Sequence, residues 1–366
     1  MKVTYQIFFT GKSPELSDAE FYRREMALAE LAEPLGFEGI WCVEHHFDGP
    51  YSMCPDNFAV LSYLAARTER ITLTTGGAIL PWNDPLRVAE KFALLDNLSG
   101  GRMQLGVGRG LSKLEYDTFG IDMGEARGRM EESLDMILAA LDSGVMEHAG
   151  EFYTQKAAPI RPAPLKKISN RDVVSIAMSP ESRLTAAQRG TAVASFAQFP
   201  VEQHAADFEQ YREEYRKHHD DEPPRVVLSD SVYCSEDAAE CEATSKQAIY
   251  THFALTTAHY GLDKSGHFDN ISGYQNYAAM ADAMIAAGKE AAAEGYRSAQ
   301  LCGTPAELVE RIRQRYEAFG DYDQNCGFSC GGMDHDKAEA SMRLFAEKVL
   351  PELRQLGIPV REPAAV

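Results

Sequence analysis

The sequence predicts an α/β fold, namely a TIM-type (β/α)8 barrel with insertions. Strand-like apolar runs alternate with amphipathic helical stretches along the chain, a pattern that favours a parallel sheet. About eight strand–helix units can be distinguished, which is the number that closes such a barrel. The length of 366 residues suits a single barrel domain. A doubly wound open sheet remains the alternative, because periodicity alone does not separate the two folds.

In the first half of the chain, each predicted strand is followed by a predicted helix. The strands are Val3–Phe9, Gly39–Val43, Ile71–Leu80 and Met103–Val107. The helices are Asp18–Leu35, Asp56–Arg67, Pro85–Leu98 and Glu125–Leu141. Apolar residues at helical spacing support the first helix, which Gly36 ends, and Pro85 suits the first position of the third helix.

The second half is interrupted twice. The proline-containing segment Ala149–Asn170 is expected to be an insertion between units, and Thr251–Ala299 is expected to be irregular. The remaining predicted strands are Val173–Met178, Ala192–Ala197, Val226–Tyr233 and Cys326–Ser329. The remaining predicted helices are Pro180–Arg189, Val201–Lys217, Asp237–Tyr250, Pro305–Phe319 and Asp336–Leu356. We therefore expect one domain over residues 1–366.

Composition and charge restrict the possible partners. The formal net charge of −19 argues against nucleic acid or an anionic membrane as a partner, but not against a small anionic cofactor. No apolar run approaches the roughly 20 residues of a membrane span, and that of Met1–Phe9 is too short for a signal peptide. The scattered cysteines do not suggest a disulfide framework, so we expect a cytoplasmic protein. No metal site is expected, since Cys326, Cys330 and His335 lack a fourth ligand.

Reactive residues of a barrel lie just past the carboxyl ends of its strands. Glu44-His45-His46-Phe47 occupies such a position after the second strand. Adjacent histidines on a strand point to opposite faces, so they do not easily chelate one metal. One of them could act as a base near neutral pH, or the pair could be packed or exposed at a loop.

Two further strand ends could bind a phosphate. The stretch Gly106–Leu111 lacks the third glycine of a dinucleotide fingerprint, but its glycines allow a flat ring to approach and Arg109 could pair with a phosphate. A surface ion pair is the alternative for Arg109. Ser179 and Ser182 begin a predicted helix, where they could bind an anion or simply cap the helix.

These segments occur within a longer series that resembles the bacterial luciferase α subunit and related luciferase-like monooxygenases. The series covers nearly the whole chain in order. Its members are Glu44–Phe47, Ile79–Pro81, Pro85–Glu90, Leu95–Arg102, Gly108–Leu111, Phe119–Met123, Arg127, Gly303–Pro305 and Ser341–Phe345.

The resemblance implies a barrel that binds reduced FMN at the strand ends, with His45 as catalytic acid/base. It places a non-proline cis peptide at Gly76-Gly77 beneath the flavin ring. It implies that the flavin phosphate lies near Arg109, Arg127, Ser179 and Ser182. The expected cofactor-binding set is completed by Glu44, Gly108, Leu111 and Met178.

The sequence departs from the light-emitting enzyme at several of these positions. Gly108 replaces a reactive cysteine, Met178 stands where an acidic residue precedes the phosphate serine, and Glu115 is the acidic residue after the glycine stretch. FMN binding is still implied, but light emission and specificity for long-chain aldehydes are not. The region Gly261–Gly295, within the segment 251–299, corresponds to the active-site lid. The residues expected to face the substrate, or the lid, are Trp82, Glu115, Phe268 and Tyr274.

The predicted function is that of a two-component monooxygenase. A separate NAD(P)H:flavin reductase supplies reduced FMN, O2 adds to it as the C4a-hydroperoxide, and a small organic substrate is oxidised. The alternatives are an F420-dependent oxidoreductase on the same fold and a non-catalytic flavin-binding or subunit partner. A homodimer is expected, with a heterodimer open. Its interface would use the second and third helices, unless their apolar residues pack on the barrel: Phe58, Val60, Leu61, Leu64, Phe92, Leu94 and Leu95.

Overall fold

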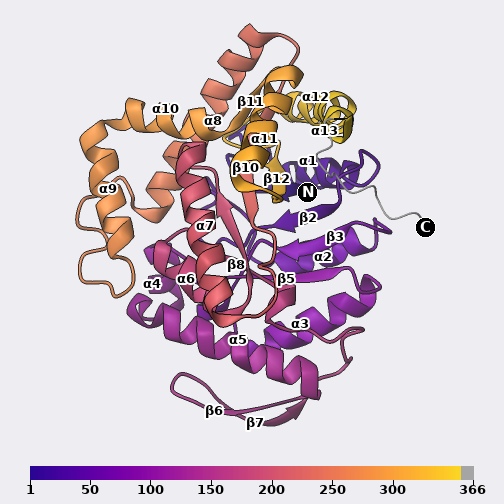
Figure 1. Cartoon of the computed structure of the whole chain (residues 1–366), viewed down its shortest axis with the longest axis vertical. Helices are drawn as coiled ribbons and strands as arrows, with labels where there is room; N and C mark the ends of the chain where they lie inside the picture. Colours follow the sequence, from indigo (N-terminus) through magenta and orange to yellow (C-terminus); the bar gives the residue numbers. More distant parts are fainter. Residues whose placement is uncertain (356–366) are drawn as a thin grey trace.

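Eight parallel strands close into a barrel (Figure 1). The computed structural model describes residues 1–355. Around the ring the strands are β1 (Val3–Ile7), β2 (Gly39–Cys42), β3 (Thr72–Thr75), β5 (Met103–Gly108), β8 (Val173–Ile176), β9 (Ala192–Phe196), β10 (Val227–Cys234) and β12 (Asp323–Gly327). β10 pairs with β9 and β12, and β12 pairs with β1, so the ring is continuous. The predicted barrel is confirmed, and the open-sheet alternative is wrong.

Helices surround the barrel and follow the predicted order (Figure 1). They are α1 (Asp18–Leu31), α2 (Asn57–Ala65), α3 (Pro85–Leu98), α5 (Ala126–Ser143), α6 (Pro180–Arg189), α7 (Val201–His218), α8 (Ala238–Tyr260) and α11 (Pro305–Phe319). Ser17, Asp56 and Asp84 cap α1, α2 and α3 by accepting a backbone N–H in the first turn. No helix of the described part of the chain has both the length and the apolar composition needed to cross a bilayer.

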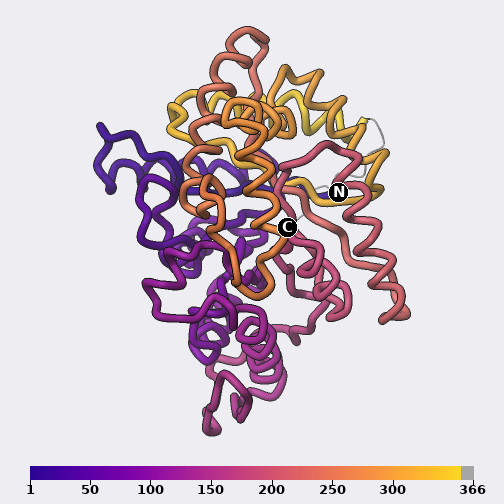
Figure 2. Tube along the Cα trace, turned by 90° about the vertical axis from the view of Figure 1, so that its left-hand side faces the viewer, coloured from indigo at the N-terminus to yellow at the C-terminus, as the bar shows by residue number. Residues whose placement is uncertain are grey.

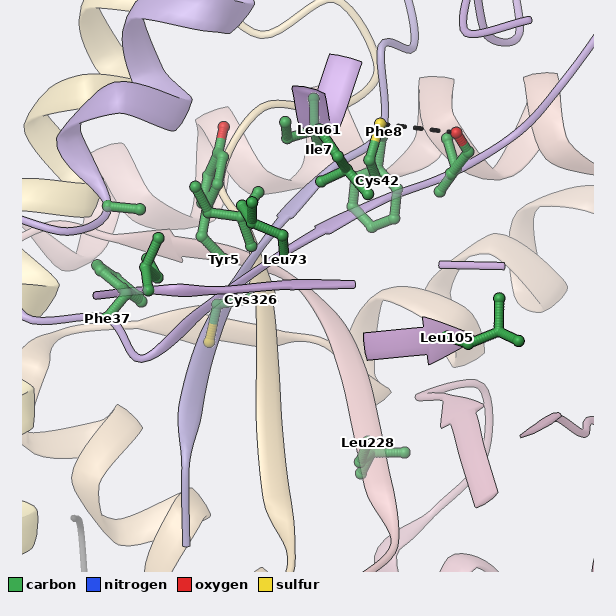
Figure 3. Close-up of a cluster of buried hydrophobic side chains, with 14 of the residues drawn as sticks. Tyr5, Ile7, Phe8, Phe37, Cys42, Leu61, Leu73, Leu105, Leu228 and Cys326 are labelled. Carbon is green, nitrogen blue, oxygen red and sulfur yellow. Dashed lines mark hydrogen bonds between the residues drawn. The ribbon is translucent and has the colours of Figure 1, made fainter. Parts of the chain in front are cut away.

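The strand residues divide between two buried environments. Tyr5 and Ile7 of β1 and Leu73 of β3 belong to the main apolar cluster (Figure 3). Thr4 of β1 instead donates from Oγ1 to Asn325 Oδ1 of β12 at 2.8 Å. Asn325 in turn donates to Ser229 Oγ of β10 at 3.1 Å. This alternation follows from the two-residue period of a strand, and it places a layer of polar side chains inside the barrel.

The region Thr251–Ala299, expected to be irregular, is mostly helical, so that prediction is wrong. α8 continues to Tyr260, and two more helices follow, α9 (Gln275–Ala287) and α10 (Lys289–Ala299). Both contain many alanines, the residue with the highest helix propensity. Apart from Gly288 between these two helices, only residues 261–274 of this region lie outside a helix. Figure 2 shows this orange segment crossing the face turned toward the reader.

Other predicted boundaries also differ. The strand Ile71–Leu80 is divided into β3, a cis peptide bond between Gly76 and Gly77, β4 (Ala78–Ile79) and a turn of 3-10 helix at Leu80–Trp82. The insertion forms the hairpin β6 (Val145–Ala149) and β7 (Thr154–Pro159). The sequence analysis missed α4 (Lys113–Phe119) and β11 (Leu301–Gly303). The closing helix comprises α12 (His335–Leu344), a π-helical turn (Phe345–Val349) and α13 (Leu350–Gln355), and Leu356 lies outside the described residues.

Candidate functional site

A cavity opens at the carboxyl ends of the barrel strands, where the sequence predicted the site. Its empty space, including the part open to solvent, is about 1300 Å³. Most of the predicted site residues line it: Glu44, His45, Gly76, Gly77, Trp82, Gly108, Arg109, Leu111, Glu115, Met178 and Ser182. They come from segments that the barrel closure brings together, as expected for this fold.

Four predicted residues do not line this cavity. Arg127 lines a smaller neighbouring cavity, and Ser179 is fully buried as the N-cap of α6, accepting the Ser182 N–H. Phe268 and Tyr274, expected to face the substrate or to belong to the lid, lie in the segment 261–274 and pack in a separate aromatic cluster with Tyr116 and Tyr277. Tyr116 belongs to α4, so this cluster joins the segment to that helix.

His45 follows β2 and is placed by contacts to two other segments. Its Nδ1 lies 3.3 Å from Glu115 Oε1, and its Nε2 lies 3.5 Å from the Tyr260 hydroxyl. The ring of Tyr51 packs edge-on against it, with the ring centroids 4.8 Å apart. A carboxylate facing Nδ1 favours the tautomer that carries its hydrogen there and leaves Nε2 able to accept a proton.

Glu115 is a buried carboxylate with several donors around one oxygen. Oε1 accepts the His46 N–H at 2.7 Å and lies 3.6 Å from His259 Nε2. Burial alone would raise the pKa of Glu115, but the facing His259 and His45 rings outweigh it and lower the pKa to about 2. Glu115 is therefore ionised at neutral pH.

The contacts of Glu115 extend to a residue near the surface. His259 Nδ1 lies 3.1 Å from Asp48 Oδ2, so that Asp48, His259, Glu115 and His45 form a continuous chain. The sequence analysis missed Asp48 and His259, because His259 lies in the segment expected to be irregular. One possible metal-ligand atom from each of His45, Glu115 and His259 lies within 4.8 Å of the other two, so these residues could also hold a metal ion. His45 lies within hydrogen-bond distance of Glu115, and the 3.6 Å between Glu115 and His259 is an ion-pair distance; we assign no metal.

Among the described residues, the Glu44 carboxylate accepts hydrogen bonds from other protein groups. Oε1 accepts from Trp82 Nε1 and Asn83 Nδ2, both at 2.8 Å, and Oε2 accepts the Ile79 N–H at 3.3 Å. These bonds attach the end of β2 to the turn after β4. Glu44 therefore shapes the wall beside Gly76-Gly77, and its contact with the cofactor stays a prediction.

The smaller cavity has the chemistry of an anion site. Arg109 and Ser182 line both cavities, and Arg127, Thr185 and Arg189 line the smaller one. Arg127 Nη1 donates to Thr185 Oγ1 at 3.1 Å, while its Nη2 is buried without a hydrogen-bond partner. Burial and the charge of Arg109 lower the Arg127 pKa, while the charges of Glu131, which also lines this cavity, and of Glu181 oppose this shift. An anion here would satisfy Nη2 and offset the repulsion between the two cations.

Helical spacing explains two of these residues. Thr185 and Arg189 follow Ser182 at positions three and seven along α6, so they share one face of that helix with it. The sequence analysis missed both, although this spacing could have revealed them. The N-terminus of α6 lies at the same place and adds its partial positive charge.

The segment 261–274 contacts the arginine shared by the two cavities. Arg109 Nη1 donates to the Gly273 carbonyl at 2.9 Å, and its guanidinium carbon lies 4.0 Å from the centre of the Tyr274 ring. Tyr274 also donates to the Gly110 carbonyl at 2.9 Å. Tyr274 therefore covers Arg109 and does not line the larger cavity.

Comparisons with known proteins agree with this geometry. A family model described as luciferase-like monooxygenase matches residues 1–322. The alkanal monooxygenase alpha chain of Photobacterium leiognathi is 27% identical, over 97% of this chain and 99% of that one. The oxygenase component of the flavin-dependent trigonelline monooxygenase of Acinetobacter baylyi is 27% identical, over 99% and 98%. The crystal structure of the monooxygenase RslO1 from Streptomyces bottropensis is 26% identical, covers 96% of this chain and 99% of that one, and gives a TM-score of 0.80.

The lowered pKa of Glu115 predicts a pH-dependent contribution to stability. A depressed pKa stabilises the fold above the ordinary value of 4.5, and this contribution is lost as the pH falls toward about 2. We expect Glu115→Gln to lower the free energy of unfolding by on the order of 3 kcal/mol at pH 7, and the difference from wild type to shrink between pH 4.5 and about 2. Urea unfolding at several pH values measures this. Glu147→Gln at an exposed site is the control, and a difference that does not depend on pH would contradict the prediction.

Proposed function

The chain belongs to the luciferase-like monooxygenase family, and from this premise we propose that it is the oxygenase component of a two-component system. It would oxidise a small organic substrate with O2 and with reduced FMN from a separate NAD(P)H:flavin reductase. The observation that carries the proposal is that the two cavities share Arg109 and Ser182 in their walls. The larger cavity is lined by His45, and the smaller one is the anion pocket. We place this activity in the cytoplasm, where the seven free cysteines would stay reduced.

The residues present fit FMN at both of its ends. The unpartnered Nη2 of Arg127, together with Arg109 and the start of α6, would hold the phosphate. The ring system would occupy the larger cavity, beside the backbone of Gly76 and Gly77 and close to His45. When bound, the reduced cofactor supplies the electrons and the site of oxygen activation.

The protein contributes protonation, orientation and exclusion of water. His45 would exchange a proton through Nε2 with the reacting groups, while Glu115 fixes its ring through Nδ1. Glu115 is kept in place by the His46 amide and by His259. The segment 261–274 covers Arg109 and would limit access of water to the reacting atoms.

We also propose a homodimer formed through α2 and α3. Tyr63, Leu94 and Leu98 are 50, 49 and 60% exposed, and the two helices pack side by side. Other apolar residues considered for this interface are instead buried against the barrel: Phe58, Leu61, Leu64, Phe92 and Leu95.

Replacing both Leu94 and Leu98 with glutamate should convert the dimer to a monomer, because two charges would be buried at the contact. Sedimentation velocity of the wild-type and doubly substituted chains provides the test. A wild-type chain that sediments as a monomer would contradict the homodimer, and one that dimerises only with a second protein would favour a heterodimer.

Removing the Arg127 guanidinium, whose Nη2 has no partner, should weaken binding of the FMN phosphate. Arg127→Met is expected to raise the Kd for reduced FMN by about 10- to 100-fold, as for loss of hydrogen bonds to a charged group. Riboflavin, which has no phosphate, should bind both proteins equally. Anaerobic titration followed by flavin fluorescence measures each Kd.

Arg129→Met on the same helix is the matched control, because Arg129 lies outside the lining of both cavities. An equal loss for FMN and riboflavin would contradict the phosphate assignment. Tighter binding of reduced F420 than of reduced FMN would favour the deazaflavin-dependent alternative.

Loss of the His45 imidazole should impair oxidation of the substrate without preventing cofactor binding. With pre-reduced FMN and O2, His45→Ala is expected to lower the yield of oxidised substrate by about a hundredfold or more. The flavin electrons should then appear as released H2O2, while the Kd for FMN changes little. His46→Ala removes the neighbouring ring, which lies outside the cavity lining, and is the control. An unchanged product yield in His45→Ala would refute the role of His45.

A further inference from the structure

Part of the larger cavity is lined by polar side chains that lack partners. Thr10 follows β1, Ser231 lies on β10, and His252 and Thr256 lie one turn apart on α8. Thr10 Oγ1, Ser231 Oγ, His252 Nδ1 and Thr256 Oγ1 are all buried without a hydrogen-bond partner. The Tyr51 hydroxyl lies beside Thr256 and the Cys330 thiol beside Ser231. Thr10 and His252 therefore give the clearest indication of an unmet hydrogen bond.

Unpartnered buried polar atoms are uncommon in folded proteins, and each calls for a physical explanation. Within a cavity wall, the usual explanation is a ligand or a water molecule that completes the hydrogen bond. The atoms described above belong to three separate elements around one space. A single molecule in that space could satisfy several of them together.

The carboxylates that line the cavity already have partners, so the substrate would meet no free anion there. Glu44 accepts from Trp82 and Asn83, and Glu115 is bonded by the His46 amide. Asp230 forms a two-point ion pair with Arg315, at 2.7 and 2.9 Å. None of these groups offers an unpaired negative charge to a cationic substrate.

Positive charge is confined to the phosphate end of the cavity. Arg109 is the one arginine or lysine of the lining, and it adjoins the anion pocket. Burial lowers the pKa of His252 to about 4, so its ring is neutral at pH 7. A carboxylate-bearing substrate would therefore find no free cation near Thr10 and His252.

Aromatic rings surround the same groups. The centre of the His252 ring lies 5.4 Å from that of Phe8 and 6.4 Å from that of Tyr296. Phe196 and Tyr260 also line the cavity. Such flat walls favour a flat ligand, because aromatic pairs gain energy from stacked and edge-on contacts.

We infer that the substrate is a neutral ring compound that carries hydroxyl or carbonyl groups, and that Thr10 and His252 bind those groups. This inference rests on the proposed function and specifies the substrate of the same site. An alkanal, named for one relative, would leave most of these polar atoms unsatisfied. Trigonelline, named for another, carries a carboxylate for which this part of the cavity has no free cation.

A matched set of ligands tests this inference on the full chain loaded with oxidised FMN. The probes are 2-naphthol, 1-tetralone and 1,4-naphthoquinone as neutral oxygenated rings, naphthalene-2-carboxylate as the anion, and decanal as the apolar chain. Isothermal titration calorimetry should give at least one neutral ring a Kd about tenfold or more below those of the anion and the alkanal. Equal or tighter binding of naphthalene-2-carboxylate or decanal would overturn the inference.

Substitutions that keep shape and remove hydrogen bonding test the residues. Thr10→Val and His252→Phe should each raise the Kd of the tightest neutral ring by about five- to tenfold. Thr257→Val is the control, because Thr257 is the neighbour of Thr256 on α8 but lies outside the cavity lining. Neutral-ring affinities that do not change in Thr10→Val and His252→Phe would refute the assignment, since water alone would then satisfy these atoms.

Two results separate this inference from the proposed function. FMN affinity and O2-dependent turnover of reduced FMN are measured on the same proteins. A wild-type chain that binds FMN but does not prefer neutral rings would refute the substrate class alone. A chain that does not bind reduced FMN would refute the proposed function, whatever the ring affinities are.

Discussion

The geometry of the barrel mouth depends on the contacts of the buried Glu115 carboxylate. It lies on α4 and binds the His46 amide while facing His45 and His259. His45 follows β2 and His259 ends α8, so one charged oxygen joins three elements that are far apart in the sequence. Because hydrogen bonds keep this group ionised despite burial, it can fix the His45 ring in one orientation.

The second organising feature is the pair of arginines at the anion pocket, of which Arg109 also lines the larger cavity. Arg109 and Arg127 bring like charges together in a partly buried pocket, which is unfavourable without an anion. At present Arg109 contacts the Gly273 carbonyl and the Tyr274 ring. The segment that follows α8 therefore contacts the anion pocket through Arg109, while α8 itself supplies His259 and Tyr260 to the surroundings of His45. Under the proposed function, this one stretch of chain would connect cofactor binding with the arrangement of His45.

Much of the barrel could be predicted because burial leaves a strong period in its strands and helices. The strand predicted over Ile71–Leu80 was too long, since the apolar run alone does not show the break at Gly76-Gly77. The cis bond that the family resemblance implied there is confirmed. The helices α9 and α10 were missed, although the high helix propensity of their many alanines was a usable signal. In the site, position at strand ends pointed to the His45-His46 pair and to Arg109 as candidates, and only the family resemblance singled out His45. The proximity of His259 to Asp48 depends on how α8 packs across the mouth, which no local pattern encodes.

A crystal structure of the chain with FMN bound tests the central claim most directly. The account predicts phosphate oxygens within hydrogen-bond distance of Arg127 Nη2 and of the first turn of α6, and a flavin ring between His45 and Gly76-Gly77. A phosphate bound elsewhere, or a ring system outside the cavity that contains His45, would contradict it.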